Sequence, residues 1–392
     1  MRFGWADAWA GLGRGWASFQ RRWADLKVAG LGRRGLGLDL RAESLLWVDL
    51  AQGRDGQTRL TGWGRLDFPE AVSEGSAAPS DAVVRSLQSW VQSAALEGRT
   101  VAMGLPSAHV LLRRTRFRSG MGGLGAEELA AYVEGEAAAW APFAMEDLAL
   151  DFAVLGPTAA GMQAASGVPV AAVGPAHAAA LAASTASTAS TAFADEVEVL
   201  MAAARQDRVR ARQALAQAAG LKLQVLDIES NAALLALRAW RPPDGQLGTG
   251  EALGLVDAQR AALNLRVMAQ GEIVFERSEA VGPGVSGPWW LQTLSRLLQL
   301  FHAAHAGRRL VGLALVGDHA GVPDRVEWPH SIARLAGVPA WWMDPFVHLG
   351  CAEGSRPAAS PPLVRGPGAR PAPDQACAYA LACGLALRAL AP

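Results

Sequence analysis

Two aspartates at the ends of strand-like segments are the residues best placed to do chemistry. Asp39 follows the alternating residues that begin at Gly37, and Asp257 ends the apolar run 253–257. A glycine beside such an aspartate lets backbone N–H groups approach phosphate oxygens, because it lacks a Cβ and adopts the required turn. Each aspartate is expected to lie in a β-hairpin, and two hairpins of this kind predict a site for ATP with Mg²⁺. The candidate cofactor-binding residues are Asp39, Arg41, Ser44, Asp257, Gly282, Gly284 and Gly317.

The composition narrows the classes of protein. A chain of 392 residues is expected to form more than one domain, because single cores stop growing near ~250–300 residues. Its 36 Lys and Arg balance 36 Asp and Glu, so no nucleic acid partner is expected. The three cysteines are too few for a disulfide framework and form no C-x-x-C pair, which favours a reducing compartment.

The apolar pattern predicts neither a membrane-spanning helix nor a signal peptide. No run approaches the ~20 uninterrupted apolar residues that a spanning helix needs. Charged residues such as Arg14, Arg21 and Asp25 interrupt the place where a signal peptide would have its apolar core. Retention in the cytoplasm is therefore expected.

The first 27 residues predict an amphipathic helix. Its apolar stripe, at alternating steps of four and three, is Trp5, Trp9, Leu12, Trp16, Phe19, Trp23 and Leu26. Basic residues outnumber acidic ones on the other faces, as in helices that lie in the headgroup layer of a membrane. The stripe is equally consistent with packing on the protein itself or on a partner helix, and four glycines weaken the helix.

The rest of the chain alternates strands and helices, and its second half repeats the order of its first. The first half is expected to contain a β-meander over 35–64, a helix over 81–97 and a buried strand over 101–105. The second half is expected to contain strand 197–202, helix 207–219, strand 221–228, a meander over 253–277, a helix bearing Trp290 to Phe301, strand 310–316, an edge at 341–345 and a closing helix over 376–390.

Between the halves lies a segment of different character. Strand 110–117, helix 126–139 and strand 148–155 predict a small α/β unit. Residues 156–194 are rich in Ala, Ser, Thr and Gly and predict a flexible insertion, and residues 352–373 predict a Pro/Gly-rich loop.

This order predicts an α/β protein with an actin-like (ribonuclease-H-like) two-domain fold and an inserted small α/β subdomain. Residues 1–34 are the amphipathic N-terminal segment. Residues 35–105 and 340–392 are expected to form the first actin-like domain, 106–200 the inserted subdomain, and 201–339 the second actin-like domain.

Several short segments, none specific alone, resemble a known family through their order along nearly the whole chain. They are Gly37-Leu38-Asp39-Leu40 with Ser44 and Val48-Asp49-Leu50, Trp140-Ala141-Pro142-Phe143, Leu150 to Leu155, Val197 to Ala204, Ala219-Gly220-Leu221, Leu226 to Glu229, Asp344-Pro345-Phe346, and Gly384 to Arg388. The chain resembles the PilM family of actin-like type IV pilus assembly proteins.

The resemblance implies a cytoplasmic scaffold, peripheral to the inner membrane, that binds the N-terminal peptide of the membrane protein PilN. An extended peptide in a groove between the first domain and the inserted subdomain would bind through backbone hydrogen bonds and apolar pockets. Val110, Trp140 and Phe143 are the candidate partner-binding residues, with core packing as the alternative role for both aromatics.

The sequence departs from the family's pattern in the expected nucleotide pocket. Arg41 stands where glycine is usual, Leu46 where lysine is usual, and Ala258 replaces the glycine after Asp257. Asp318 follows a single glycine, Gly317, where the motif usually has two. The departures predict a degenerate pocket and weigh against hydrolysis of ATP, although Arg41 could still pair with phosphate bidentately, so that binding without hydrolysis stays open. The alternatives are an ATP-binding actin-like switch and an actin-like component of a type II secretion platform.

Two other patterns resemble ligand-binding motifs, but a purely structural role explains each of them better. Residues 120–125 match G-x-G-x-x-G, but the preceding strand carries arginines and cannot be the buried first strand of a dinucleotide-binding unit. His302 and His305 have helical spacing but no third metal ligand nearby, so His305 is expected to complete an apolar face.

Overall fold

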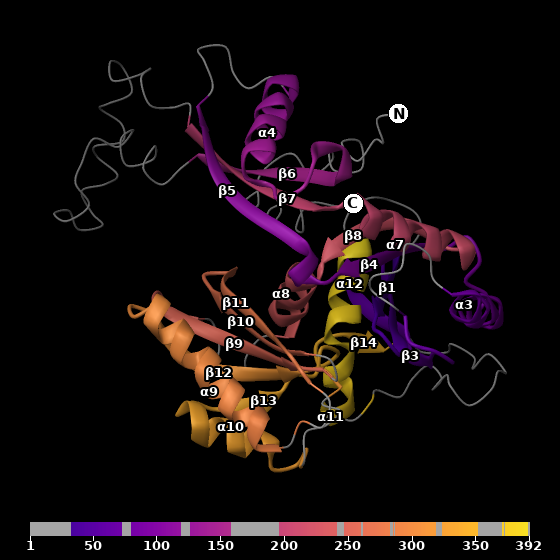
Figure 1. Cartoon of the computed structure of the whole chain (residues 1–392). Helices are drawn as coiled ribbons and strands as arrows, with labels where there is room; N and C mark the ends of the chain where they lie inside the picture. The colour runs from indigo at the N-terminus through magenta and orange to yellow at the C-terminus, as the bar shows by residue number, and fades with distance from the viewer. Residues whose placement is uncertain are drawn as a thin grey trace. The chain divides into compact units, whose positions relative to one another are not determined.

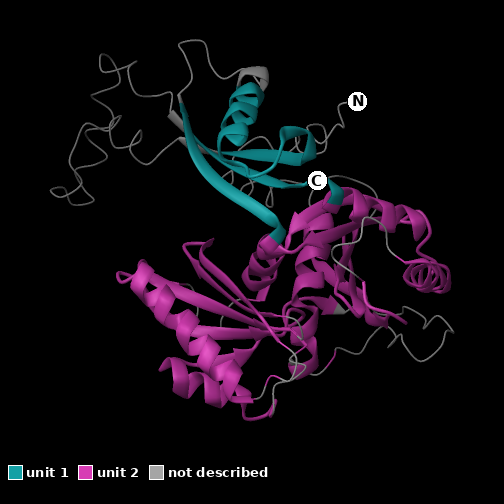
Figure 2. Ribbon diagram, viewed as in Figure 1, with its two compact units in different colours: residues 1–28, 109–207 teal, residues 29–108, 208–392 magenta. Residues whose placement is uncertain are grey.

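The computed structural model describes residues 33–72, 80–118, 126–157, 196–240, 247–259, 262–282, 285, 287–318, 324–351, 371 and 373–390. The expected N-terminal helix, the 120–125 motif and almost all of the 156–194 and 352–373 segments lie outside the described residues. The chain divides into a smaller compact unit that contains residues 109–207 and a larger one that contains residues 29–108 and 208–392 (Figure 2).

The larger unit contains two mixed β-sheets with matching strand orders (Figure 1). The first sheet has the order β14-β3-β2-β1-β4-β8, and the second has the order β11-β10-β9-β12-β13. In each, an antiparallel meander of three strands is followed by two parallel strands. The repeated order confirms the prediction of an actin-like α/β fold.

The elements of the first sheet and its helices come from the N-terminal, middle and C-terminal parts of the chain. The strands are β1 (Arg33–Leu40), β2 (Ser44–Gln52), β3 (Thr58–Asp67), β4 (Thr100–Leu105), β8 (Lys222–Ile228) and β14 (Gly350–Cys351). The helices are α3 (Asp81–Ser93), α7 (Gln206–Ala218), α8 (Glu229–Trp240), α11 (Pro373–Ala376) and α12 (Ala380–Leu390), with short 3₁₀ turns at Ser107–His109 and Cys377–Tyr379.

Glycines let helix α12 approach the first sheet and helix α8 at backbone distance. A Cβ on Gly37 of β1 would lie 2.1 Å from the carbonyl oxygen of Ala382. A Cβ on Gly384 of α12 would lie 1.9 Å from the carbonyl oxygen of Ala232 in α8. No side chain fits either place, so these two glycines fix α12 against its neighbours.

The second sheet is covered by large apolar side chains instead. Its strands are β9 (Glu251–Ala258), β10 (Ala262–Ala269), β11 (Glu272–Ala280), β12 (Arg309–Val316) and β13 (Ala340–Trp342), and its helices are α9 (Gly287–Ala304) and α10 (Trp328–Ala336). Trp290 and Phe301 of α9 are almost fully buried in the core of this sheet, where Phe301 meets Phe275 edge to face. His305 stacks on Phe301, as the sequence predicted for an apolar face.

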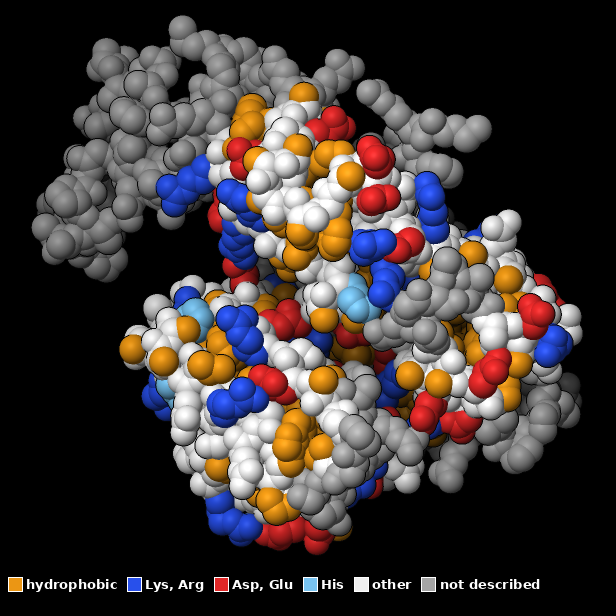
Figure 3. Space-filling model, viewed as in Figure 1, with side chains coloured by type: hydrophobic (Ala, Val, Ile, Leu, Met, Phe, Trp, Pro, Cys, Tyr) orange, Lys and Arg blue, Asp and Glu red, His pale blue; other side chains and the backbone are white. Residues whose placement is uncertain are grey.

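The smaller unit is a three-stranded antiparallel sheet in the order β5-β7-β6 with helix α4 on it. Its elements are β5 (Val110–Arg118), α4 (Ala126–Trp140), a 3₁₀ turn at Met145–Asp147, β6 (Leu148–Pro157) and β7 (Glu196–Arg205). Val133 of α4 packs on Met201 of β7 in a small apolar core. Arginine side chains of β5 form a band on the surface in Figure 3.

Two expected domain boundaries cut across a sheet. Strand β8 pairs with β4 in the first sheet, although residues 201–339 were assigned to the second domain. Strand β13 pairs with β12 in the second sheet, although residues 340–392 were assigned to the first. Periodicity identifies a strand but does not identify its neighbours. Helices α8 and α10 were not predicted, and among the described residues no helix is both long and apolar enough to cross a membrane.

Candidate functional site

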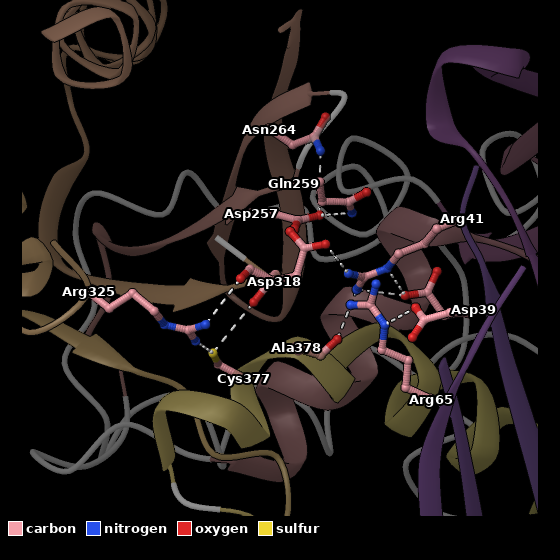
Figure 4. Close-up of polar contacts among 12 residues, drawn as sticks. Asp39, Arg41, Arg65, Asp257, Gln259, Asn264, Asp318, Arg325, Cys377 and Ala378 are labelled. Carbon is pink, nitrogen blue, oxygen red and sulfur yellow. Dashed lines mark hydrogen bonds and ion pairs between the residues drawn. The ribbon is translucent and has the colours of Figure 1, made fainter. Parts of the chain in front are cut away.

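The two predicted aspartates occupy corresponding positions in the two sheets of the larger unit (Figure 4). Asp39 is the next-to-last residue of β1, and Asp257 is the next-to-last residue of β9. Their exposed fractions are 3% and 0%. Because a buried carboxylate must be neutralised or paired, the partners of these side chains decide what the site can bind.

Arg41 compensates the charge of Asp39. Its Nε donates to Asp39 Oδ2 at 2.9 Å, its Nη1 lies 3.3 Å from Asp318 Oδ2, and its Nη2 donates to the carbonyl oxygen of Ala378 at 2.9 Å. Burial raises the pKa of Asp39, and Arg41 offsets part of that rise. Burial alone would lower the pKa of Arg41, but the carboxylates of Asp39, Asp318 and Asp257 raise it.

The hydrogen bonds of Asp257 come from its own sheet. Its Oδ2 accepts from Gln259 Nε2 at 2.9 Å, from Asn264 Nδ2 at 3.4 Å and from Arg266 Nη1 at 3.3 Å. Its Oδ1 is buried and has no hydrogen-bond partner in the part of the chain that the structure describes. Asp257 is therefore held by two side chains of β10 and by Gln259, which follows β9 directly.

Arg266 is the second buried arginine of the site. Its Nε donates to Glu276 Oε1 at 2.8 Å, and its Nη2 lies 3.9 Å from Glu229 Oε2. Burial would lower the pKa of Arg266, but Glu276, Asp257 and Glu229 raise it. Burial, with Asp39 nearby, raises the pKa of Glu229 to about 8. Glu229 is thus mainly neutral at pH 7, and Arg266 relies on Asp257 and Glu276 for its counter-charge.

The other candidate residues contribute backbone and space. Ser44 is buried, and its carbonyl oxygen accepts a hydrogen bond from the backbone N–H of Arg41 at 2.9 Å. Gly317 has φ +100°, and a Cβ there would lie 2.7 Å from Asp257 Oδ1. Gly282 has no side-chain neighbour that a Cβ would meet, and Gly284 lies outside the described residues.

A comparison with protein families shows which family the chain belongs to. The family described as type IV pilus assembly protein PilM matches residues 37–173 and 186–286, more than half of the chain. The chain belongs to the PilM family. The match includes both aspartates, Arg41 and Arg266, whereas Gly317, Asp318 and Ala378 of the site lie beyond the matched residues.

One solved structure shares the fold of this chain, and two further matches are weaker. A PilM-PilN type IV pilus biogenesis complex matches with a TM-score of 0.63 and 19% identity, over 91% of this chain and 99% of that chain. The cytoplasmic domain of EpsL from the type II secretion system of Vibrio cholerae matches with a TM-score of 0.37 and 13% identity, over 72% and 82% of the two chains. The ethanolamine utilization protein EutJ from Carboxydothermus hydrogenoformans matches with a TM-score of 0.41 and 10% identity, over 92% of this chain and 91% of that chain.

The partner-binding candidates of this PilM family member lie in the smaller unit. Val110 begins β5, and strand alternation places it on the opposite face from Arg113, whose guanidinium lies 5.8 Å from the ring of Trp140. Trp140 ends α4 and packs against the core of that unit. Phe143 is 36% exposed, with the guanidinium of Arg205 lying 5.3 Å from its ring.

The sequence-based prediction missed the side chains that hold Asp257. Asn264 and Arg266 are polar residues two positions apart in strand β10, and the alternating neighbours Leu263 and Leu265 are apolar. This alternation was a usable signal, because it puts both polar side chains on one face of the strand beside Asp257. Within the described residues no group of His, Cys, Asp and Glu is arranged to hold a metal ion.

Proposed function

We propose that this PilM family protein is a scaffold of the type IV pilus inner-membrane assembly complex that works without bound nucleotide and binds the N-terminal peptide of a PilN-like membrane protein. The observation that supports it most is the pairing of both aspartates with arginines of the chain itself. Arg41 pairs with Asp39, and Arg266 pairs with Asp257. The two guanidinium groups thus supply the positive charge that a magnesium ion would supply if a nucleotide were bound.

The residues around the aspartates do not suit Mg-ATP. Asp39 Oδ2 is engaged by Arg41, and Asp257 Oδ2 by Gln259 and Arg266. A metal at either Oδ2 would have to displace buried, charge-assisted hydrogen bonds, which are about twice as strong as neutral ones. Asp257 Oδ1, which has no hydrogen-bond partner among the described residues, is the one oxygen that favours the ATP-binding alternative. Ala258 adds a Cβ where a phosphate would need close approach of backbone N–H groups. The functional ATP-binding switch therefore remains the second candidate.

Isothermal titration of the full chain with Mg-ATP tests this part of the proposal. We expect no saturable heat up to millimolar ligand. Saturable binding that disappears in the Asp257→Ala variant would overturn nucleotide independence and favour the ATP-binding switch. Titration with Mg²⁺ alone serves as the blank for heats that do not require nucleotide.

The peptide-binding part rests on exposed apolar surface in the smaller unit. Phe143 and Met145 are 36% and 37% exposed, close together in sequence, and an arginine lies beside the Phe143 ring. An aromatic anchor of this kind suits an apolar side chain of an extended peptide. Val110 and Trp140 are proposed as further contacts, with Trp140 acting mainly through the packing that positions Phe143.

Fluorescence anisotropy with a labelled peptide from the cytoplasmic N-terminus of the PilN-like protein tests this part. Phe143→Ala is expected to weaken binding by about tenfold or more, as loss of an aromatic anchor does. Leu335→Ala, an equally exposed apolar residue (38%) on α10 of the larger unit, is the matched control and should leave the affinity unchanged. Equal affinities for wild type and Phe143→Ala would remove Phe143 from the interface.

The proposed location is the cytoplasm, at the surface of the inner membrane. The Trp-rich, basic segment 1–27 is proposed to contact that surface. Co-sedimentation with vesicles of anionic lipid should retain the full chain and lose a chain that begins at residue 29. Equal sedimentation of the two would remove the membrane role of the segment.

A further inference from the structure

Arg41 joins three segments that are distant in the sequence. Its own turn follows β1 of the first sheet, Asp318 follows β12 of the second sheet, and Ala378 belongs to the C-terminal segment 374–378. The ion pairs with Asp39 and Asp318 measure 2.9 and 3.3 Å, and the hydrogen bond to the Ala378 carbonyl measures 2.9 Å. One guanidinium thus contacts both sheets and the segment between them (Figure 4).

The same C-terminal segment is held to the second sheet by other contacts. The backbone N–H of Gly317 donates to the carbonyl oxygen of Cys377 at 3.2 Å, and Arg325 donates to the carbonyl oxygen of Asp374. The Cys377 thiol donates to the carbonyl oxygens of Asp374 and Gly317. Burial raises the pKa of this thiol to about 12, so it remains a hydrogen-bond donor.

The Arg41 contacts are sheltered from solvent. The exposed fractions of the side chains are 9% for Arg41, 4% for Asp39 and 17% for Asp318. Ion pairs at such positions are screened by salt much less than surface pairs. Two guanidinium nitrogens donate hydrogen bonds, Nε to Asp39 and Nη2 to Ala378, whereas Nη1 faces Asp318 in an ion pair and has no hydrogen-bond partner among the described residues. The position therefore favours a lasting contact between the two sheets.

We propose that Arg41 is a built-in cross-link that ties the first sheet to the end of β12 and to segment 374–378, in place of a ligand bound between the two hairpins. The inference rests on the proposed nucleotide independence, because a ligand at the same aspartates would compete with Arg41. Beyond nucleotide independence, the side chain of Arg41 would hold the two sheets in one arrangement.

The cross-link makes a prediction for one backbone amide. The Gly317 N–H donates to the Cys377 carbonyl oxygen beside the residue that Arg41 holds, and Gly317 precedes Asp318. If Arg41 is released, this edge of β12 should open locally more often while the strand's interior stays closed. Amide hydrogen exchange at Gly317, read by fragmentation mass spectrometry of the full chain, reports the opening.

We expect Arg41→Met to speed exchange at Gly317 by about tenfold or more and to leave exchange at Val267, in the core of the second sheet, unchanged. Asp318→Asn removes the negative charge that pairs with Arg41 and keeps Asp39 and Ala378 in place, and it should also speed exchange at Gly317. Arg59→Met, which breaks an exposed ion pair with Asp55, is the control and should change neither amide.

Unchanged exchange at Gly317 in a folded Arg41→Met variant would overturn the cross-link. If Arg41→Met also loses protection at Val267, the decision passes to Asp318→Asn, where unchanged exchange at Gly317 overturns it. Titration of the wild type with Mg-ATP separates the two proposals. Saturable binding would overturn nucleotide independence, whereas the exchange results decide whether Arg41 holds the sheets together.

Discussion

The two hairpins at the candidate site neutralise corresponding aspartates in different ways. In the first, the arginine follows Asp39 in the turn and reaches out to the second sheet and the C-terminal segment. In the second, Arg266 lies within strand β10, and its ion pairs within 3.5 Å are to Asp257 and Glu276 of neighbouring strands. Arg41 ties the first sheet to the end of β12, whereas Arg266 pairs mainly within the second sheet and has one longer contact, 3.9 Å, to Glu229 of helix α8.

The difference shows that similar local charge can serve opposite structural purposes. Loss of Arg41 removes the ion pair with Asp318 that joins the two sheets. It need not leave a buried charge at Asp39, because burial raises the pKa of that carboxyl and it can take up a proton. Arg266 cannot be lost so easily, because the fully buried Asp257 and the partly buried Glu276 both depend on it. Stability should therefore depend more on Arg266, and relative motion of the sheets more on Arg41.

The largest expected effect tests the interior arginine. Arg266→Met should lower the free energy of unfolding by about 3–5 kcal/mol, since removing one partner of a buried pair leaves uncompensated buried charge. Urea unfolding followed by tryptophan fluorescence measures it. Arg59→Met, which removes an arginine from an exposed pair, should cost no more than about 1 kcal/mol. Equal losses in the two variants would mean that Arg266 contributes no more than a surface residue.

A smaller effect concerns Glu229, which the charges of both aspartates affect. Its pKa is raised from 4.5 to about 8 in the folded protein, so the folded state binds the proton more tightly than the unfolded state. The resulting stabilisation is complete below pH ~4.5 and is lost as the pH rises through about 8. From pH 7 to pH 9 the wild type should lose on the order of 1 kcal/mol more than Glu229→Gln, which cannot ionise.

Urea unfolding of both proteins at several pH values measures this difference. Glu279→Gln, in an exposed ion pair with Arg296, is the control and should follow the wild type. Parallel curves for wild type and Glu229→Gln would show that Glu229 is already ionised at pH 7 and that its 3.9 Å contact with Arg266 is a true ion pair.

The sequence predicted the fold, and it singled out Asp39, Asp257 and Arg41 but not the side chains that hold Asp257. Asp39 and Asp257 were found because each ends an apolar strand, a signal that one segment carries by itself. The role of Arg41 was open, because the ion pair with Asp318 joins residues from different sheets and no local pattern brings them together. The assignment of residues 201–339 to one domain has the same cause, since β8 pairs with β4, a strand far away in the sequence, and periodicity does not encode such a pairing.

The smallest expected effect asks whether a missing glycine or a resident arginine closes the second hairpin. Ala258→Gly restores the residue that a phosphate-binding turn requires and should lower the free energy of unfolding by only about 0.5–1 kcal/mol, the usual cost of glycine in a strand. We expect no Mg-ATP binding by titration, because Gln259, Asn264 and Arg266 still hold Asp257 Oδ2. Saturable binding in Ala258→Gly alone would assign the closure to the Cβ of Ala258. Binding only when Arg41→Gly is added would assign it to the arginine of the first hairpin, and the two hairpins would then differ in function as they differ in structure.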